Sequence, residues 1–116
     1  MFERILIPVD GSEPAHGAAQ LGIDLAVEHD ATVHGLYVVE PVTVTEGGAC
    51  QVIEAMQETG NEIVSDLAEQ AEEKGLQVET DVKTGVAHRE ILDYAEANDI
   101  DLMGVGPRGR TGIGRY

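Results

Sequence analysis

The stretch IDLMGVGPRGRTG, residues 100–112, joins an apolar segment to one that is rich in glycine and arginine. Its glycines match three nucleotide-binding patterns at once. Gly104, Gly106 and Gly109 spell G-x-G-x-x-G, the dinucleotide fingerprint. Gly104 and Gly109 also fit a Walker A loop in which Arg110 replaces the lysine. A third pattern begins with G-x-x-G, as at Gly106 and Gly109, and ends with a later Gly-Ser pair. The fold around the stretch decides between the three.

Apolar segments and helical repeats alternate along the rest of the chain. Residues 5–9, ILIPV, are uniformly apolar, which is typical of a strand buried on both faces. The same reasoning predicts strands at 32–39 and 100–105, and residues 40–50 are expected to form a loop. Small and aliphatic residues at helical spacing predict three helices, which are residues 12–29 with Ser12 as N-cap, residues 53–71 and residues 87–98.

One more strand, residues 77–82, alternates strictly between two kinds of side chain, so that one of its faces meets water. This pattern is typical of an edge strand. The chain therefore predicts an α/β fold with a doubly wound parallel sheet of strand order 3-2-1-4. The winding reverses between the first and fourth strands, and ligands of such sheets bind there, beyond the carboxyl ends of the strands. The residues at those ends are Asp10 with Gly11, and Gly106 through Gly109.

This placement excludes two of the three patterns. The dinucleotide fingerprint has to follow the first strand and needs an acid about 20 residues later, whereas only seven residues follow Gly109. The Walker A loop needs a compact lysine ammonium, for which Arg110 is a poor substitute. It also needs a later strand to supply the aspartate that holds Mg²⁺, and the sequence predicts none. The third pattern remains.

Charge indicates the setting and the class of ligand. The 22 acidic and 7 basic residues give a formal net charge of -15, the opposite of what a nucleic-acid-binding module needs to neutralise phosphates. An acidic, lysine-poor surface suits molar salt, so we expect a halophile, with an ordinary acidic mesophilic protein as the alternative. Residues 104–116 hold three arginines and no acid, which favours an anion site unless these arginines pair with surface acids.

The chain carries no sign of membrane insertion or export. No apolar run approaches the ~20 residues that span a bilayer. The first residues, MFERILIPVD, lack the apolar stretch and cleavage site of a signal peptide. We therefore expect a cytoplasmic protein without a membrane partner.

Three stretches resemble one family. RILIPVDGSEPA (residues 4–15), LYVVEP (36–41) and TGVAHREILDYAEANDIDLMGVGPRGRTGIGRY (84–116) are similar to the nucleotide-binding branch of the universal stress proteins. The resemblance covers essentially the whole chain. Members of that family typically bind ATP through the motif G-x2-G-x9-G-[ST], which is the third pattern. Together with the charge, it suggests a haloarchaeal member.

The resemblance implies an adenosine site. Pro8, Val9 and Asp10 would lie beside the adenosine, with Asp10 near the ribose. Val38 would present backbone groups to the edge of the adenine.

It also implies a phosphate site. Gly106 and Gly109 would let backbone N–H groups approach the phosphates, as glycine permits. Arg108 lies between them, where many relatives carry histidine, and Pro107 removes one N–H donor, which the charge of Arg108 could offset.

The second half of the motif would begin at position 119, whereas the sequence ends at Tyr116. We therefore expect one domain, residues 1–116, that lacks the family's C-terminal portion with its fourth helix and fifth strand. The fourth strand would then be an uncovered apolar edge, and we expect self-association through it as a homo-oligomer, most simply a homodimer.

The resemblance implies an ATP-binding stress-response or signalling module, with AMP or ADP as further ligands and Mg²⁺ as a candidate ion. We expect no catalytic residue, no metal site of the protein's own and at most slow ATP hydrolysis, because no nucleophile–base pair is visible and the four histidines are not spaced as metal ligands. Two alternatives remain: an enzyme of the adenine-nucleotide α-hydrolase group, and a stress protein that binds no nucleotide and works through protein contacts.

Overall fold

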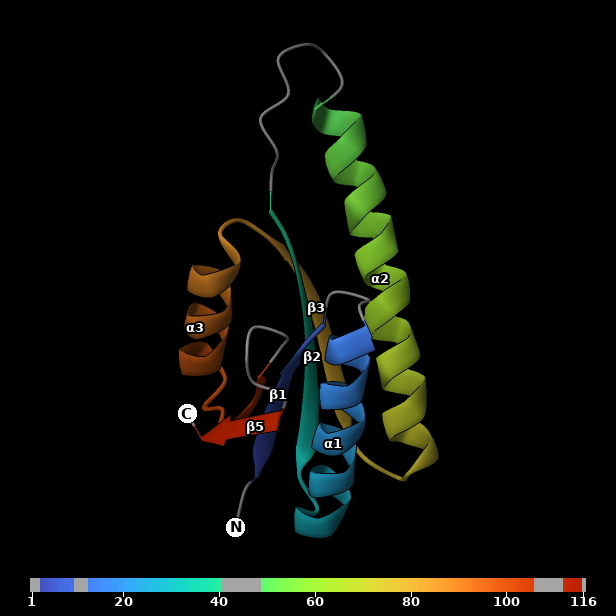
Figure 1. Ribbon diagram of the computed structural model, residues 1–116, viewed down its shortest axis with the longest axis vertical. Coiled ribbons are helices and arrows are strands. Elements are labelled where there is room, and N and C mark those ends of the chain that lie inside the picture. Colours follow the sequence, from blue (N-terminus) through green and yellow to red (C-terminus); the bar gives the residue numbers. More distant parts are fainter. Residues whose placement is uncertain (1–2, 10–12, 41–48, 106–111, 116) are drawn as a thin grey trace.

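The computed structural model describes the backbone of residues 3–9, 13–40, 49–105 and 112–115, and the side chains of residues 3–9, 17–40 and 52–103. The described residues form a five-stranded sheet and three helices (Figure 1). In chain order the elements are β1 (Arg4–Pro8), α1 (Glu13–His29), β2 (Thr32–Val39), α2 (Ala49–Glu73), β3 (Val78–Thr84), α3 (Ala87–Ala97), β4 (Leu102–Val105) and β5 (Gly112–Arg115).

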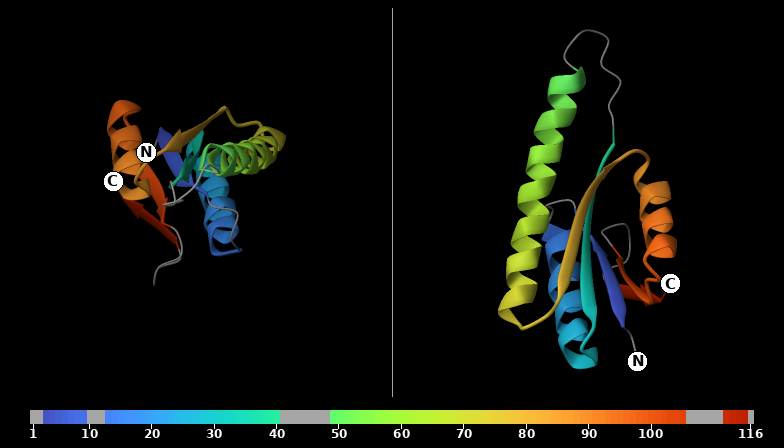
Figure 2. Two further views of the ribbon diagram at one scale, coloured as in Figure 1. Left: turned by 90° about the horizontal axis from the view of Figure 1, so that it is seen from above. Right: turned by 180° about the vertical axis from the view of Figure 1, so that it is seen from behind.

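The sheet is doubly wound. Its strand order is β3-β2-β1-β4-β5, and the first four of these strands run parallel. Figure 2 shows α1 and α2 on one face of the sheet and α3 on the other. The chain therefore winds in one direction from β1 to β3, then crosses the opposite face through α3 to reach β4. The predicted α/β fold and the 3-2-1-4 order are confirmed.

A fifth strand corrects the expectation for the sheet edge. β5 pairs antiparallel with β4, from Leu102 opposite Arg115 to Val105 opposite Gly112. The expectation that the fourth strand is an uncovered edge is therefore wrong. The outer peptide groups of β4 need partners, and an antiparallel partner needs only a short connection, whereas a parallel one needs a long crossover. With β4 covered, the predicted self-association through β4 loses its structural basis.

Strand β1 lies at the centre of the core. Ile5, Leu6 and Ile7 have no exposed surface at all, so consecutive side chains are buried on both faces of the sheet, as their uniform apolar sequence predicts. Ile5 and Ile7 belong to the cluster under α1 and α2, whereas Leu6 belongs to the cluster under α3. The smaller α3 cluster consists of Leu6, Leu36, Tyr94, Ala95 and Ile100, with Val38, Ile91 and Met103 packed against it.

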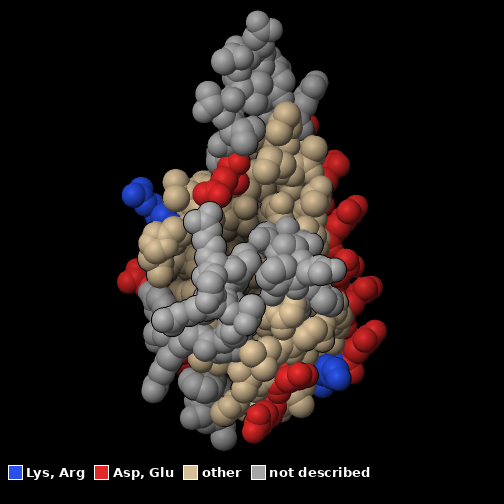
Figure 3. All heavy atoms as spheres, in the orientation of Figure 1, with Lys and Arg blue, Asp and Glu red and all other residues tan. Residues whose placement is uncertain are grey.

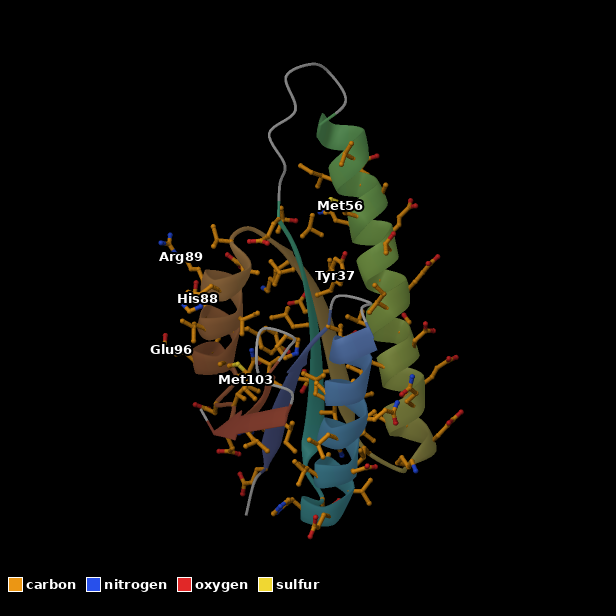
Figure 4. All side chains as sticks on the ribbon, viewed as in Figure 1. Tyr37, Met56, His88, Arg89, Glu96 and Met103 are labelled. Carbon is orange, nitrogen blue, oxygen red and sulfur yellow. The ribbon has the colours of Figure 1, made fainter. Side chains whose placement is uncertain are left out.

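Helix α2 packs closely on β2 because it carries a glycine. It begins at Ala49, inside the stretch that the sequence predicts as a loop, because only residues from 53 onward show clear helical periodicity. Gly60 is buried where the ring of Tyr37 reaches α2, and a Cβ at this position would lie 2.5 Å from Cδ1 of that ring. Figure 4 shows Tyr37 between β2 and α2. A residue that weakens the helix intrinsically is thus required by its packing.

The outer side of α2 is a row of like charges. Glu54, Glu58, Glu62 and Asp66 are exposed and follow one another at intervals of four residues. Residues four apart lie on the same side of a helix, so these carboxylates repel one another. The column of acidic side chains along this helix is visible in Figure 3. The fold therefore contains a helix that screening by salt should stabilise.

The edge at β3 is shielded by its own side chains. The N–H of Gly85 donates to the carbonyl of Val39 across the β2–β3 ladder, 2.9 Å. Because peptide groups alternate sides along a strand, the N–H of Val82 faces away from β2. It donates instead to Oδ1 of Asp81, 2.8 Å, while Oδ2 of Asp81 lies 3.3 Å from Nζ of Lys83. These charges protect the edge from pairing with another strand, which accords with its prediction as an edge.

One polar pair lies inside the core between β2 and α3. His34 is 2% exposed, and its Nδ1 lies 2.9 Å from the phenol oxygen of Tyr94. The two rings meet edge to face, with centroids 5.7 Å apart. Burial lowers the pKa of His34 below its ordinary value of 6.5 and raises the pKa of Tyr94 to about 12, because both charged forms are poorly solvated there. Both side chains are therefore neutral at pH 7.

We expect Gly60→Ala to lower the free energy of unfolding. Because the new Cβ would lie 2.5 Å from the ring of Tyr37, overpacking should cost about 2–3 kcal/mol, the upper part of its usual range, which outweighs the ~1 kcal/mol gained in helix propensity. Gly17→Ala in α1 is the matched control, since a Cβ there meets nothing within 4 Å, and it should stabilise by about 0.5–1 kcal/mol. Urea unfolding at constant KCl measures both. Equal stabilisation by the two substitutions would contradict the packing argument.

We also expect KCl to stabilise α2. The urea midpoint should rise between about 0.1 and 1 M KCl, as the Debye length shrinks from ~10 to ~3 Å. Glu58→Lys places a cation between Glu54 and Glu62, so it should raise the low-salt stability by up to about 1 kcal/mol and reduce the salt dependence. Glu58→Gln, which only removes repulsion, should give an intermediate result. A salt dependence that is identical in all three proteins would show that this row is not its cause.

Candidate functional site

The carboxyl ends of β1 and β4 meet at one edge of the sheet. The two strands are adjacent and parallel, with Leu6 opposite Met103. Each continues two residues beyond this pair, β1 to Pro8 and β4 to Val105. The winding of the sheet reverses between these strands, which is where open α/β sheets bind ligands. The carboxyl ends of β1 and β4 therefore lie side by side.

Contacts at the amino ends of β1 and β4 fix this register. Oδ2 of Asp101 accepts the backbone N–H groups of Glu3 and Arg4, at 2.9 and 3.0 Å. The N–H of Asp101 donates in return to the carbonyl of Arg4, 3.0 Å. A charged acceptor strengthens such bonds. The residue just before β4 thus holds the start of β1, and this contact fixes which residues of the two strands lie together at their carboxyl ends.

Pro8 and Val9 continue β1 to that edge. Both are partly exposed, and the N–H of Val9 donates to the carbonyl of Leu36 on β2, 2.9 Å. Val9 packs against the cluster under α1 and α2. Val38 packs against the cluster on the other face, under α3. The side chains of Val9 and Val38 therefore lie on opposite faces of the sheet, so a ligand at this edge could meet both only by straddling the ends of the strands.

The backbone of Val38 is oriented toward the switch point. The carbonyl of Leu36 accepts the hydrogen bond from the N–H of Val9, and so it faces β1. Peptide groups two residues apart face the same side of a parallel strand. The peptide groups of Val38 consequently face the side of β2 on which β1 lies. The last residue of β1, Pro8, is paired with Leu36, two residues before Val38. This geometry leaves Val38 next to the place where the β1 strand ends.

The remaining predicted site residues, Asp10, Gly106, Arg108 and Gly109, lie outside the described residues. What the structure places are the strands that carry them. Asp10 comes two residues after the end of β1, and Gly106 directly follows the end of β4.

A residue that the sequence reasoning missed, Glu40, links two elements at the same edge. Its Oε2 accepts the N–H of Ala87 in the first turn of α3, 3.1 Å. The N-cap residue of α3, Val86, offers no side-chain hydrogen bond, so a carboxylate from the end of β2 takes over the capping role. The absence of Ser, Thr, Asp or Asn at the start of this helix indicates that a residue from elsewhere caps it. Nothing in the local sequence identifies that residue as Glu40.

A side-chain hydrogen bond links α2 to β3 at the carboxyl ends of the strands. The amide Nε2 of Gln57 donates to Oγ1 of Thr84, 3.2 Å. Gly85 follows, with φ of +154°, and a Cβ there would lie 2.8 Å from Oε2 of Glu90. His88 and Arg89 lie on the outer side of α3, directed away from the sheet (Figure 4). The β3 part of this edge is therefore held closely by contacts within the chain.

Two grooves lined by described residues are found along β3, away from the switch point. One, of about 330 Å³, runs between β3 and α3 and is lined by Glu79, Thr80, Asp81, Lys83, Glu90, Asp93, Tyr94, Ala97 and Asn98. The other, of about 270 Å³, is polar and lies between β3 and α2. Neither groove is lined by a residue of β1 or β4, so both lie apart from the switch point.

Other classes of site find no support in the part of the chain with described side chains. No three His, Cys, Asp or Glu residues in that part gather as a metal site would require. His34 lies nearer the amino end of β2, bonded to Tyr94, and so away from the switch point.

None of the described helices is both long and apolar enough to cross a membrane.

Comparison with known proteins identifies the family. The family model described as "Universal stress protein family" matches residues 1–116. A universal stress protein of Methanocaldococcus jannaschii is 35% identical over 119 residues, covering 99% of this chain and 70% of the relative. A solved structure from the family, of Burkholderia pseudomallei, superposes with a TM-score of 0.82 at 20% identity, covering 90% of this chain and 82% of the other.

Two further structures share the fold and were solved with nucleotides. A universal stress protein family protein of Arabidopsis thaliana with AMP bound has a TM-score of 0.71 at 17% identity, covering 92% of this chain and 78% of the other. A universal stress protein in complex with cAMP has a TM-score of 0.70 at 15% identity, covering 88% and 74%. Sequence, fold and strand order agree, and the chain belongs to the universal stress protein family.

Proposed function

We propose that this chain is an adenine-nucleotide-binding module of stress response or signalling. The observation that carries the proposal is the common exit of β1 and β4 at the point where the winding reverses. The glycine- and arginine-containing segment of the sequence directly follows β4. Structures of the same fold with AMP and with cAMP support the choice of an adenine nucleotide.

The adenosine would lie across the ends of β1 and β2. Val38 would offer its backbone N–H and carbonyl to the adenine edge, since its peptide groups face the side on which β1 ends. Pro8 and Val9 would supply apolar contacts beside the base. Asp10 would accept hydrogen bonds from the ribose hydroxyls, as a carboxylate two residues past the strand can.

The phosphates would lie beyond β4. Gly106 and Gly109 would allow the backbone to approach them closely, and Arg108 would contribute positive charge. ATP is the ligand that we propose, with AMP and ADP as weaker ligands because they present fewer phosphate oxygens to this segment. If Mg²⁺ accompanies ATP, Asp10 is the carboxylate that we nominate to approach it.

Binding without fast turnover is the activity that we propose. Hydrolysis needs a positioned base or metal near the attacked phosphate, and Asp10 is the sole carboxylate that we assign to the site. We expect at most slow ATP hydrolysis. An α-hydrolase-like enzyme would release pyrophosphate from ATP, so a pyrophosphate assay distinguishes that alternative. A member that acts only through protein contacts would show no binding at all.

The expected setting is a salt-adapted cytoplasm. The net charge of -15 and the acidic row on α2 support it. Screening at high salt would reduce repulsion between this surface and an anionic nucleotide. A homodimer remains our expectation. Among the described strands, β5 forms the sheet edge beyond β4, and the homodimer could form through it.

Calorimetric titration at about 1 M KCl, where screening is strong, tests the proposal. We expect binding of ATP, ADP and AMP, and no binding of GTP. Arg108→Ala should weaken ATP binding by roughly tenfold, the loss of one charge-assisted contact, and should leave adenosine binding unchanged. Arg89→Ala, on the outer side of α3, is the matched control. Absence of heat and of a thermal shift with every adenine nucleotide would refute the proposal.

A further inference from the structure

The buried pair of His34 and Tyr94 takes no part in the proposed nucleotide site. Nδ1 of His34 and the phenol oxygen of Tyr94 share one hydrogen bond. The other ring nitrogen, Nε2, is buried and has no hydrogen-bond partner among the described residues. Buried polar atoms in native proteins are usually paired, so an unpartnered one needs an explanation. In the neutral imidazole this arrangement leaves one buried polar atom unpaired.

Protonation would make the arrangement much less favourable. A charged imidazole carries hydrogens on both nitrogens, so Nδ1–H must donate to the phenol oxygen, and Nε2–H becomes a buried donor without a described acceptor. The surroundings offer limited compensation. Of the charged groups on the packed strands, Glu79 of β3 favours the proton and Arg4 of β1 opposes it, while burial opposes it most strongly. From α3 the facing group is the neutral phenol of Tyr94, and the described residues of β4, Leu102 and Met103, are apolar.

Helix α3 depends on this contact. It is 11 residues long, shorter than the ~12–15 residues that an isolated helix needs for marginal stability. Its buried side chains are Tyr94 and Ala95, so packing on the sheet through these residues holds it in place. Besides the apolar cluster, two described polar contacts attach it: His34 to Tyr94, and Glu40 to the N–H of Ala87. A positive charge on His34 would therefore weaken the contact at Tyr94, which helps to attach α3 to the sheet.

We propose that His34 makes the attachment of α3 to the sheet sensitive to acid. When the imidazole takes up a proton, α3 tilts or opens so that water can reach Nε2. α3 leads directly into β4, and β4 carries the glycine-containing segment. Acidification in the range just below neutral therefore loosens the element that positions this segment, whether or not a nucleotide binds there.

The sign of the pH dependence follows from linkage. The unfolded or opened state binds the proton with the ordinary pKa of 6.5, whereas the folded state has a lower pKa. The stabilisation is fully present above pH 6.5 and is lost as the pH falls below it, until the folded pKa is reached. The opening constant of α3 should rise by up to about tenfold for each pH unit in that window.

Amide hydrogen exchange of the intact chain between about pH 7.5 and 5.5, at constant high KCl, measures this directly. The amides of α3 should lose up to about tenfold in protection below pH 6.5. The amides of α2, a helix without histidine, provide the internal reference and should keep theirs. Unchanged protection of α3 relative to α2 across this range would overturn the proposal.

Variants assign the effect to the pair. His34→Phe with Tyr94→Phe removes the titrating ring together with its partner, so that no polar atom is left unpaired. This double variant should lose the pH dependence of α3, whereas the exposed control His88→Gln should retain it. Retention of the wild-type pH dependence by the double variant would exclude His34 as its source.

NMR titration of the unsubstituted protein covers the case in which the double variant fails to fold. The ring protons of His34 should titrate with a pKa below its ordinary value of 6.5, because burial disfavours the charged ring. The α3 amides should shift at the same midpoint as His34. If the α3 amides do not follow the titration of His34, the proposal is wrong.

Discussion

The parallel pairing of β1 with β4 is the constraint on which the candidate site depends. These strands are 97 residues apart at the contact between Arg4 and Asp101, and the carboxylate of Asp101 joins them by accepting two backbone N–H groups. Their pairing brings the first strand exit and the fourth strand exit to one edge. It can form only because α3 crosses the face opposite to α1 and α2, which reverses the winding. The cluster around Leu6 and Tyr94 under α3 is therefore as important to the site as the residues at the edge itself.

Much of this fold could be predicted from local pattern. The uniform apolar run at 5–9 and the alternation at 77–82 distinguish a central strand from an edge strand, and the order 3-2-1-4 satisfies both assignments. β5 could not be predicted this way, because its sequence, GIGR, has neither period and acquires its structure by pairing with β4. Gly60 likewise reads as a defect in a helix until the ring of Tyr37 is placed against it.

The candidate site was predictable where it depends on strand ends and less so where it depends on distant contacts. Pro8 and Val9 continue the first strand, and Val38 lies near the end of the second, so topology alone brings them to the same edge. Glu40 escaped notice because its partner, Ala87, is 47 residues away and no pattern in the sequence joins them. His34 could be assigned to a strand, but its burial and its bond to Tyr94 arise only when α3 packs on the sheet.

The most direct test of the central claim is the map of backbone amide shifts in an NMR titration with AMP at high KCl. The account predicts that the perturbed amides gather at the carboxyl ends of the parallel strands, at Val9, Val38 and Glu40 and in the segments after β1 and β4. Perturbations that instead follow the grooves along β3, or the amino ends near Asp101, would contradict it, because the site would then not lie where β1 and β4 emerge together.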